Sequence, residues 1–373
     1  MNKLILLLVL ISGPVVAQDR NFNGDHISHY YMTGGYTNGI FKNTAFEPAP
    51  HPRRLAKTPQ ANLKAAADSV QEFDSYTLAT VMIDRGKIVY QRYSRGTDEN
   101  TEFNSWSMSK SITNILVGQA LCSGDISSID DPAYKYVPSI KNTVYGQSTI
   151  RELLMMTSGA TGQDPRTGST LGSNYELTRG FKSQRDYILR DGLIYGPRGV
   201  WTYDGLHSNT LGLILDSLRG RKHYVQTFLN QAGVASKSHW FTDKDGHINA
   251  AFGLGLTLDD WARVAQLSMD MLHNQANIPN RDCVSKFMQV GTQSLVTPDE
   301  MKALNYTSYF GWGYTWTDPA VKHGYAWQGA FGQKAWFDPT TQRIVIQFRN
   351  FRNKEHSIHM VKFYRQWRTG HYD

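Results

Sequence analysis

The sequence predicts an α+β fold in which both ends of the chain build one antiparallel sheet and a mostly helical region is inserted between them. Segments rich in β-forming residues, separated by turn residues, lie at about 75–95 and 320–350. Helical pieces and long loops fill about 105–300. The cleft between a sheet and such a helical layer is a natural position for a ligand site.

Composition and charge narrow the class of protein. The 373 residues are 40% hydrophobic and 19% charged, which is enough apolar material for a large core and excludes global disorder. The net charge is +7, but the basic residues form no block, so we expect no nucleic-acid partner. Only two cysteines occur, Cys122 and Cys283, which excludes a disulfide-rich scaffold and an all-cysteine zinc site.

Residues 1–17 have the pattern of a secretory signal peptide. Lys3 precedes the apolar run Leu4–Ile11, and small or modest residues lead to a predicted cleavage after Ala17. This run is too short to span a bilayer and no later run reaches that length, so we expect no stable membrane insertion after cleavage. The sequence therefore predicts an exported protein, periplasmic or secreted. In an oxidising compartment the two cysteines could pair or remain separate buried thiols, and the sequence leaves both open.

The N-terminal part of the exported chain lacks a clear period. Residues 18–58 are polar, with Gly, Asn, His and Pro, and predict an irregular extension before a domain over 59–373. Because the extension carries six Phe and Tyr residues, we expect it to pack across that domain, near the cleft.

Periodicity then predicts the elements of the domain in order. A helix over Pro59–Phe73 precedes strands Thr77–Asp84 and Lys87–Tyr93, which a turn with Gly86 joins into a hairpin. The later helices show the helical period of apolar residues, and the later strands show the alternating period. The expected helices are Ser107–Cys122, Ile150–Met156, Ser208–Leu218, Leu258–Met271 and His359–Trp367, and the expected strands are Tyr325–Gln328, Gln333–Phe337 and Arg343–Arg349. Five strands thus form one antiparallel sheet flanked by terminal helices.

One short motif has catalytic potential. Ser107-Met108-Ser109-Lys110 opens a predicted helix, and positions i and i+3 share a helix face, so the Lys amine can reach the Ser hydroxyl. The helix N-terminus favours a developing negative charge on that oxygen. Alone, the motif is more typical of a capping serine followed by a solvated lysine, so the assignment depends on further motifs.

Further motifs in the same order create a resemblance to a known superfamily. The segment 103–113 (FNSWSMSKSIT) resembles the active-site segment of the serine β-lactamase and penicillin-binding-protein superfamily, and is most similar to its class C, esterase and 6-aminohexanoate-dimer hydrolase branch. The resemblance covers about residues 75–365. It extends to 86–90 as the preceding hairpin, to 149–159 as the TIRxLLxMTSG signature, to 199–203 and 209–212 as the segment with the catalytic tyrosine, and to 327–333 as the third motif.

The resemblance implies a β-lactamase/transpeptidase-like fold and a set of roles. Ser107 would be the acylated nucleophile, Lys110 its base or proton shuttle, and Tyr203 a second acid/base group. The backbone N–H groups of Ser107 and Ala330 would form the oxyanion hole, a device typically worth roughly 10²–10³ in rate. No metal or organic cofactor is implied, and no His-Glu-x-x-His or other tight ligand cluster occurs.

The second motif departs from the class C pattern. The class C sequence Tyr-x-Asn reads Tyr203-Asp204-Gly205 here, so the asparagine of that motif is missing. Asn209 could replace its contact with a substrate amide, and we include it among the predicted substrate-binding residues.

The third motif also departs from the β-lactamase pattern. Lys-Thr-Gly is replaced by Trp327-Gln328-Gly329, which we predict to bind substrate. An indole in place of the cation favours esters or amides with an apolar flank over β-lactams. Lys322 or Lys334 could supply a charge instead, or both could be solvated loop residues.

These observations predict an exported serine hydrolase that cleaves a small-molecule or peptide-like ester or amide through an acyl-enzyme on Ser107. Alternatives are a D,D-peptidase or β-lactamase acting on cell-wall peptides or β-lactams, an acyltransferase, and a non-catalytic binding protein that retains the fold. The sequence determines neither the substrate nor the oligomeric state.

Overall fold

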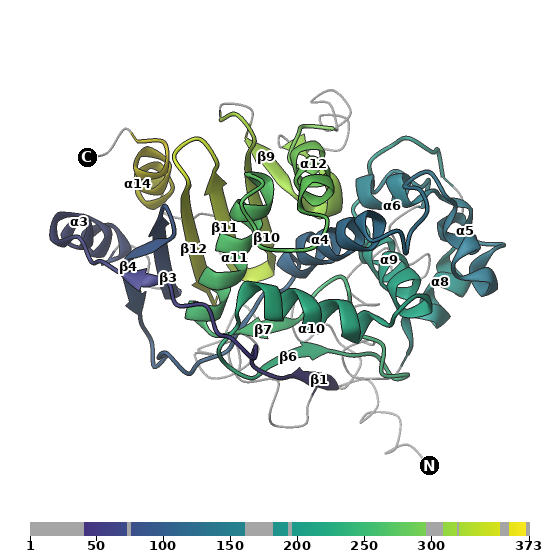
Figure 1. Ribbon diagram of the computed structural model, residues 1–373, viewed down its shortest axis with the longest axis horizontal. Coiled ribbons are helices and arrows are strands. Elements are labelled where there is room, and N and C mark those ends of the chain that lie inside the picture. Colours follow the sequence, from purple (N-terminus) through teal and green to yellow (C-terminus); the bar gives the residue numbers. More distant parts are fainter. Residues whose placement is uncertain are drawn as a thin grey trace, which may run out of the picture.

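The computed structural model describes residues 41–72, 76–160, 182–192, 196–295, 309–318, 321–350 and 358–370. Within this part, a sheet and a helical region lie side by side (Figure 1). The main sheet has the strand order β2-β4-β3-β12-β11-β10-β9-β8. Its five antiparallel central strands come from both ends of the chain, as predicted: β3 (Thr77–Asp84), β4 (Lys87–Tyr93), β10 (Gly324–Gly329), β11 (Gln333–Asp338) and β12 (Arg343–Arg349).

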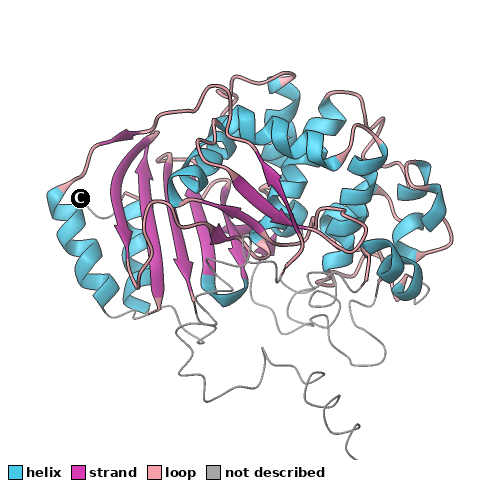
Figure 2. Cartoon of the chain, turned by 90° about the horizontal axis from the view of Figure 1, so that it is seen from below, coloured by secondary structure: helices cyan, strands magenta, loops and turns pink. Residues whose placement is uncertain are grey.

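The two faces of this sheet pack against different layers. On β3, Val81 and Ile83 join the core shared with the helical region, whereas Met82 faces a smaller apolar cluster. That cluster includes residues of α3 (Ala61–Glu72) and α14 (Ile358–Arg368), which cover the outer face (Figure 2). Because both faces are covered, all eight residues of β3 are buried, which explains its nearly continuous apolar sequence.

The α+β class is confirmed, but the expected count of five strands was too low. The main sheet gains the edge strands β2 (Ala56–Lys57), β8 (Tyr309–Phe310) and β9 (Trp316–Asp318). A second sheet, in the order β1-β6-β7-β5, also forms. Its strands are β1 (Asn43–Phe46), β5 (Phe103–Asn104), β6 (Ser238–Phe241) and β7 (Leu254–Leu256). These strands have two to four residues, too few for a period to show in the sequence.

The described part of the N-terminal extension is not irregular throughout, because it contains β1 and β2. It packs across the domain: the Ala49 N–H donates to the Val234 carbonyl at 2.7 Å, and the Arg53 N–H donates to the Gly233 carbonyl at 2.9 Å. Phe41 enters a small apolar cluster with Phe241, Ala251 and Phe252. The predicted signal peptide and residues 18–40 lie outside the described residues.

The helical region is organised around α4 (Met108–Cys122), which lies between the sheet and the helices α6 and α9 (Figure 1). Most of its fifteen residues are buried, so it is a core element and not a surface helix. The helices predicted at 107–122, 150–156, 208–218 and 258–271 are all confirmed. The surrounding helices are α5 (Val144–Gln147), α6 (Ile150–Met155), α8 (Gln184–Asp191), α9 (Gly205–Ser217), α10 (Arg221–Ala232), α11 (Leu258–Leu272) and α12 (Arg281–Gly291), with 3₁₀ turns η1 (Ala133–Lys135), η2 (Pro138–Ile140), η3 (Trp312–Tyr314) and η4 (Ala330–Gly332).

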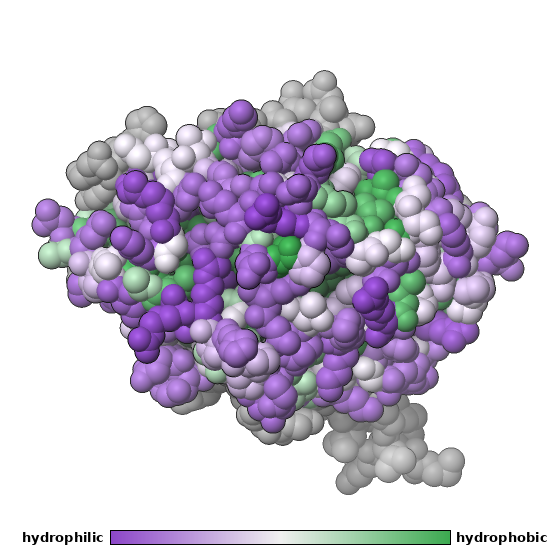
Figure 3. All heavy atoms as spheres, viewed as in Figure 1, coloured by the Kyte–Doolittle hydropathy of each residue, from purple (hydrophilic) through white to green (hydrophobic). Residues whose placement is uncertain are grey.

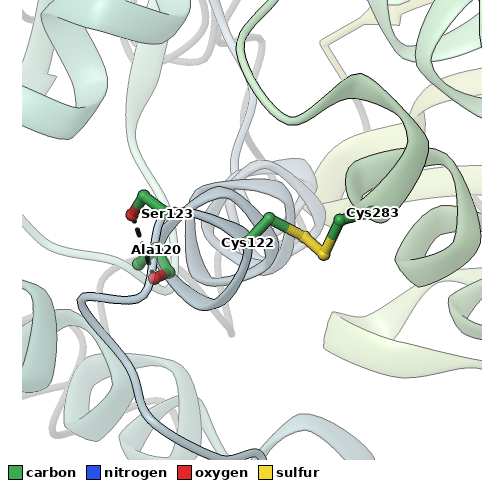
Figure 4. Close-up of a disulfide and its surroundings, with 4 residues drawn as sticks. All are labelled: Ala120, Cys122, Ser123 and Cys283. Atoms are coloured by element: carbon green, nitrogen blue, oxygen red, sulfur yellow. Dashed lines mark hydrogen bonds between the residues drawn. A yellow bond between two sulfur atoms is a disulfide. The ribbon is translucent and has the colours of Figure 1, made fainter.

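A disulfide joins α4 to α12 (Figure 4). Cys122 at the end of α4 is bonded to Cys283, 161 residues later in the chain. One turn earlier, Gly118 has no side chain, and a Cβ there would clash with the Phe287 ring of α12. The two helices are therefore covalently linked and in close contact one turn before the disulfide.

On the face shown in Figure 3, hydrophilic residues dominate and hydrophobic residues form small patches between them. Across the described ranges, no helix has both the length and the apolar character needed to cross a bilayer.

Removal of the disulfide should lower stability substantially. Cys122→Ala with Cys283→Ala should reduce the free energy of unfolding by about 2–5 kcal/mol, because the crosslink closes a long loop and restricts the unfolded chain. Urea unfolding of wild type and variant, each with and without reductant, measures this. Reductant should destabilise wild type only, and equal stability of oxidised wild type and variant would contradict the prediction.

Candidate active site

Ser107 stands at the N-terminus of α4 with its hydroxyl available for chemistry. It has φ −69° and ψ −5°, and its side chain makes no capping hydrogen bond to the helix. The preceding turn is well anchored: the Ser105 N–H donates to the Leu254 carbonyl at 2.8 Å, and the Trp106 N–H donates to Asn104 Oδ1 at 2.9 Å. Strands β5 and β7 therefore hold the nucleophile's turn in place.

The three residues predicted to be catalytic lie together. Lys110 Nζ donates to Ser107 Oγ at 3.0 Å, and Tyr203 OH lies 2.8 Å from the same oxygen. Lys110 Nζ is also 5.0 Å from the centroid of the Tyr203 ring. Ser107 and Tyr203 are partly exposed, whereas Lys110 is buried. A hydroxyl reachable from solvent thus contacts two groups able to exchange protons with it.

The loop that follows β6 fixes the side-chain nitrogen of Lys110. Lys110 Nζ donates to the Ala251 carbonyl at 2.8 Å, and Thr113 Oγ1 donates to the Ala250 carbonyl at 2.8 Å. The Ala251 N–H is in turn held by the side-chain oxygens of Asn249 at 3.1 Å and Asn209 at 3.2 Å. We call residues 249–253 the lysine loop. Nothing in its sequence, NAAFG, signalled this role.

Asn209 therefore belongs to the support of Lys110. Its side chain is fully buried, with the oxygen on Ala251 and the amide nitrogen lacking a hydrogen-bond partner. In this structure it has no exposed atom with which to make the contact to substrate that the sequence predicted.

The segment that carries Tyr203 is attached to the end of α6. The Gly199 N–H donates to the Thr157 carbonyl and the Thr202 N–H donates to the Met156 carbonyl, both at 2.9 Å. Met156 itself is left-handed at φ 56°, which turns the chain at the helix end. The signature 149–159 and the tyrosine segment are thus parts of one hydrogen-bonded unit.

Behind Tyr203, a buried histidine closes the turn into α9. Asp204 caps α9 by accepting the Leu206 N–H at 3.0 Å, and its carboxylate also accepts the Tyr145 hydroxyl. His207 Nε2 lies 2.7 Å from Ser158 Oγ and Nδ1 lies 3.2 Å from the Asp204 carbonyl. The Asp204 carbonyl can only accept, so Nδ1–H donates to it; in a neutral ring Nε2 is then an acceptor, and the Ser158 hydroxyl donates to it. Burial lowers the pKa of His207, so the ring is neutral.

The third motif lies against the nucleophile's turn. A Cβ at Gly329 would clash with the Ser105 carbonyl and come within 3.0 Å of Trp106 Cβ, so glycine permits this approach. Ala330 follows it and is exposed, and its carbonyl accepts Gln333 Nε2 at 3.2 Å. The approach brings Ala330 beside the start of α4. Its pairing with the Ser107 N–H as an oxyanion hole stays a prediction.

The side chains of Trp327 and Gln328, the first two residues of the third motif, point in different directions. Trp327 is 1% exposed and packs in the core, with its ring centroid 4.6 Å from that of Phe337. Its indole therefore does not supply an apolar flank to the site. Gln328, the next residue, is partly exposed at the end of β10. Alternation along the strand sends the two side chains to opposite faces.

The two alternative cations are differently placed. Lys322 is exposed in the turn before β10. Lys334 stands opposite Gln328 in the β10–β11 register, with its ammonium 5.4 Å from the Trp336 ring centroid. Burial, and to a lesser extent the charge of Arg349, lower the pKa of Lys334 to about 8. The hydrogen bonds of Ser107 involve neither lysine.

Among the described residues, no group of three or more His, Cys, Asp or Glu side chains could hold a metal ion. The side chains that contact Ser107 Oγ are Lys110 and Tyr203.

Comparison with known sequences agrees with this geometry. A sequence model of the family described as Beta-lactamase matches residues 64–359. The chain belongs to the β-lactamase family. A curated β-lactamase of Psychrobacter immobilis is 24% identical over 180 residues, which cover 45% of this chain and only 44% of that protein. The match thus spans less than half the length of that relative.

Solved structures share the fold of this β-lactamase-family chain. A Bacillus anthracis protein named as a 6-aminohexanoate-dimer hydrolase has a TM-score of 0.73 at 18% identity, covering 93% of this chain and 94% of that one. EstCE1, described as a hydrolase with promiscuous acyltransferase activity, has a TM-score of 0.62 at 15% identity, covering 80% and 96%. The predicted superfamily and its β-lactamase/transpeptidase-like fold are confirmed.

The buried His207 should make stability fall at acidic pH. The pKa of His207 is lowered in the folded state. Below about pH 6.5 this residue therefore binds a proton in the unfolded chain but stays unprotonated in the folded chain. Relative to His207→Gln, wild type should therefore lose up to about 2 kcal/mol of unfolding free energy between pH 8 and about pH 5. Urea unfolding across this range measures the difference. The exposed His223→Gln is the control, and a pH-independent difference for His207→Gln would refute the prediction.

Proposed function

We propose that this β-lactamase-family chain is a serine hydrolase that cleaves an ester or amide bond through an acyl-enzyme on Ser107. The observation that carries the proposal is the contact of Ser107 Oγ with both Lys110 Nζ, at 3.0 Å, and Tyr203 OH, at 2.8 Å. A hydroxyl is a weak nucleophile until a neighbouring group accepts its proton, and here two such groups lie within hydrogen-bond distance of it.

The reaction follows from these contacts. Ser107 Oγ attacks the substrate carbonyl while its proton passes to Lys110 or Tyr203. The backbone N–H groups of Ser107 and Ala330 stabilise the negative oxygen that forms. Tyr203 then returns the proton to the departing alcohol or amine, so the C–O or C–N bond breaks and the acyl group stays on Ser107. Water, activated by the same pair, releases the acid and regenerates the hydroxyl.

Two observations favour a small-molecule or peptide-like ester or amide over a β-lactam. The position that carries a cation in β-lactamases is Trp327, which is buried in the core. The alternative cation Lys334 has its ammonium over the Trp336 ring. A substrate carboxylate thus has no cationic partner from the third motif itself.

We further propose that the protein is exported after cleavage of residues 1–17. The disulfide between Cys122 and Cys283 supports this, because such bonds persist mainly in oxidising compartments. Expression of the full-length gene with fractionation and N-terminal sequencing tests it. A mature chain beginning at Gln18 in the exported fraction is expected, and an intact Met1 in the cytoplasm would refute it.

A covalent probe tests the nucleophile. One fluorophosphonate adduct per chain is expected by intact mass, lost in Ser107→Ala and slowed at least about 10²-fold in Lys110→Ala. Tyr203→Phe should lower turnover of p-nitrophenyl esters by about 10²–10⁴ with its fold intact. Ser123→Ala, at the other end of α4, is the matched control and should behave as wild type.

The same assay separates the alternatives. Faster turnover of a chromogenic cephalosporin than of any ester would indicate a β-lactamase, and D-alanyl-D-alanine release from a cell-wall peptide would indicate a D,D-peptidase. Absence of an adduct on folded wild type would refute catalysis at Ser107 and leave a binding protein.

A further inference from the structure

We infer that Trp106, Phe252 and Phe331 form an aromatic wall that binds the acyl part of the substrate. This inference rests on the proposed acyl-enzyme chemistry at Ser107 and names the class of acyl group: an apolar, preferably aromatic, group close to the scissile carbonyl.

The wall lies next to both predicted oxyanion donors. Trp106 directly precedes Ser107, and Phe331 directly follows Ala330. The close approach at Gly329 brings these two segments together, and the Trp106 and Phe331 ring centroids are 5.0 Å apart. A carbonyl oxygen held between the two backbone N–H groups would therefore have these rings beside it.

Phe252 extends the wall past Trp106. Its ring is stacked on the Trp106 ring at 6.0 Å with an interplanar angle of 14°. Phe252 belongs to the lysine loop and directly follows Ala251, whose carbonyl holds Lys110. The wall thus borders the nucleophile, the lysine loop and the third motif.

The rings are arranged as a supported surface. Trp106 and Phe331 are partly exposed, whereas Phe252 is buried at 3% exposure. Behind Phe252 lie Phe241, with a centroid 6.3 Å away, and Phe41, 5.0 Å from Phe241. The buried Phe252 ring supports Trp106, and Trp106 in turn contacts Phe331, so the two outer rings present one supported apolar face.

The backbone of both outer residues is unusual. Trp106 has φ 45° and Phe331 has φ 63°, in the left-handed region that bulky side chains rarely adopt. Glycine would relieve this cost at either position, yet the chain carries its largest aromatic side chain at one and Phe at the other. Such strain is typical of residues that serve a site.

The position of Tyr203 indicates which part of the substrate lies against the aromatic wall. Tyr203 contacts Ser107 Oγ and donates the proton to the leaving group in the proposed mechanism, so the leaving group departs towards Tyr203. None of the rings of the wall comes from the segment of Tyr203: they belong to the turn before α4, the lysine loop and η4. We therefore assign the acyl group, which stays on Ser107, to the side of the wall.

Ester pairs that differ by one phenyl group test the inference. Wild type should hydrolyse p-nitrophenyl phenylacetate with a higher kcat/KM than p-nitrophenyl acetate. Phe331→Gly should lower that preference about tenfold, because it removes the ring while glycine accepts the left-handed backbone. The acetate ester reports any damage to the oxyanion turn, and Phe331→Leu should restore part of the preference.

Controls distinguish this inference from the proposed function. Methyl acetate and benzyl acetate differ by one phenyl group on the leaving alcohol, and the ratio of their kcat/KM values should be the same in wild type, Phe331→Gly and Phe331→Leu. Fluorophosphonate labelling of Ser107 checks each variant. Normal labelling with an unchanged phenylacetate preference would overturn the wall and leave the hydrolase intact, as would a change confined to the leaving-group pair. Failure of wild type to label would overturn both proposals.

Discussion

The buried amino group of Lys110 is the constraint around which the site is built. A nitrogen donor on a side chain with 1% exposure needs acceptors inside the protein, because burial removes its hydration. Lys110 Nζ donates to Ser107 Oγ at 3.0 Å and to the Ala251 carbonyl at 2.8 Å. The Ala251 carbonyl can accept this hydrogen bond only if the lysine loop keeps its position. Hydrogen bonds from the loop to Asn209, Asn249 and Thr113 hold it there. The nucleophile's partner is thus positioned by three buried polar side chains.

The site also depends on three chain segments meeting at one helix end. Hydrogen bonds to the end of α6 hold the segment of Tyr203, and β5 and β7 hold the turn before Ser107. Gly329 lets β10 approach that turn more closely than any other residue would allow. The disulfide and Phe287 fasten the opposite end of α4 to α12. Because α4 is anchored at both ends, its first turn is a rigid platform for Ser107.

Much of the fold could be predicted because its main elements carry local periodic patterns. The five central strands and the helices α3, α4, α6, α9, α11 and α14 were located to within two or three residues. The strands of the second sheet were not, because each has two to four residues and is defined by a partner far along the chain: β1 pairs with β6, almost 200 residues away. A period cannot show in so few residues, and pairing over that separation leaves no local trace.

The sequence by itself determined which side chains meet at the nucleophile, because Ser107 and Lys110 are one turn apart on a helix and Tyr203 lies in a recognisable segment. Only the tertiary structure decided what surrounds them. Trp327 and Asn209 were plausible substrate contacts by motif position, but strand alternation and helix packing bury both. Trp106, Phe252 and Phe331 come from three separate segments and form one wall only once Gly329 has brought β10 against the turn before α4. Motif order is a property of the chain, whereas the direction of a side chain depends on which layer it packs against.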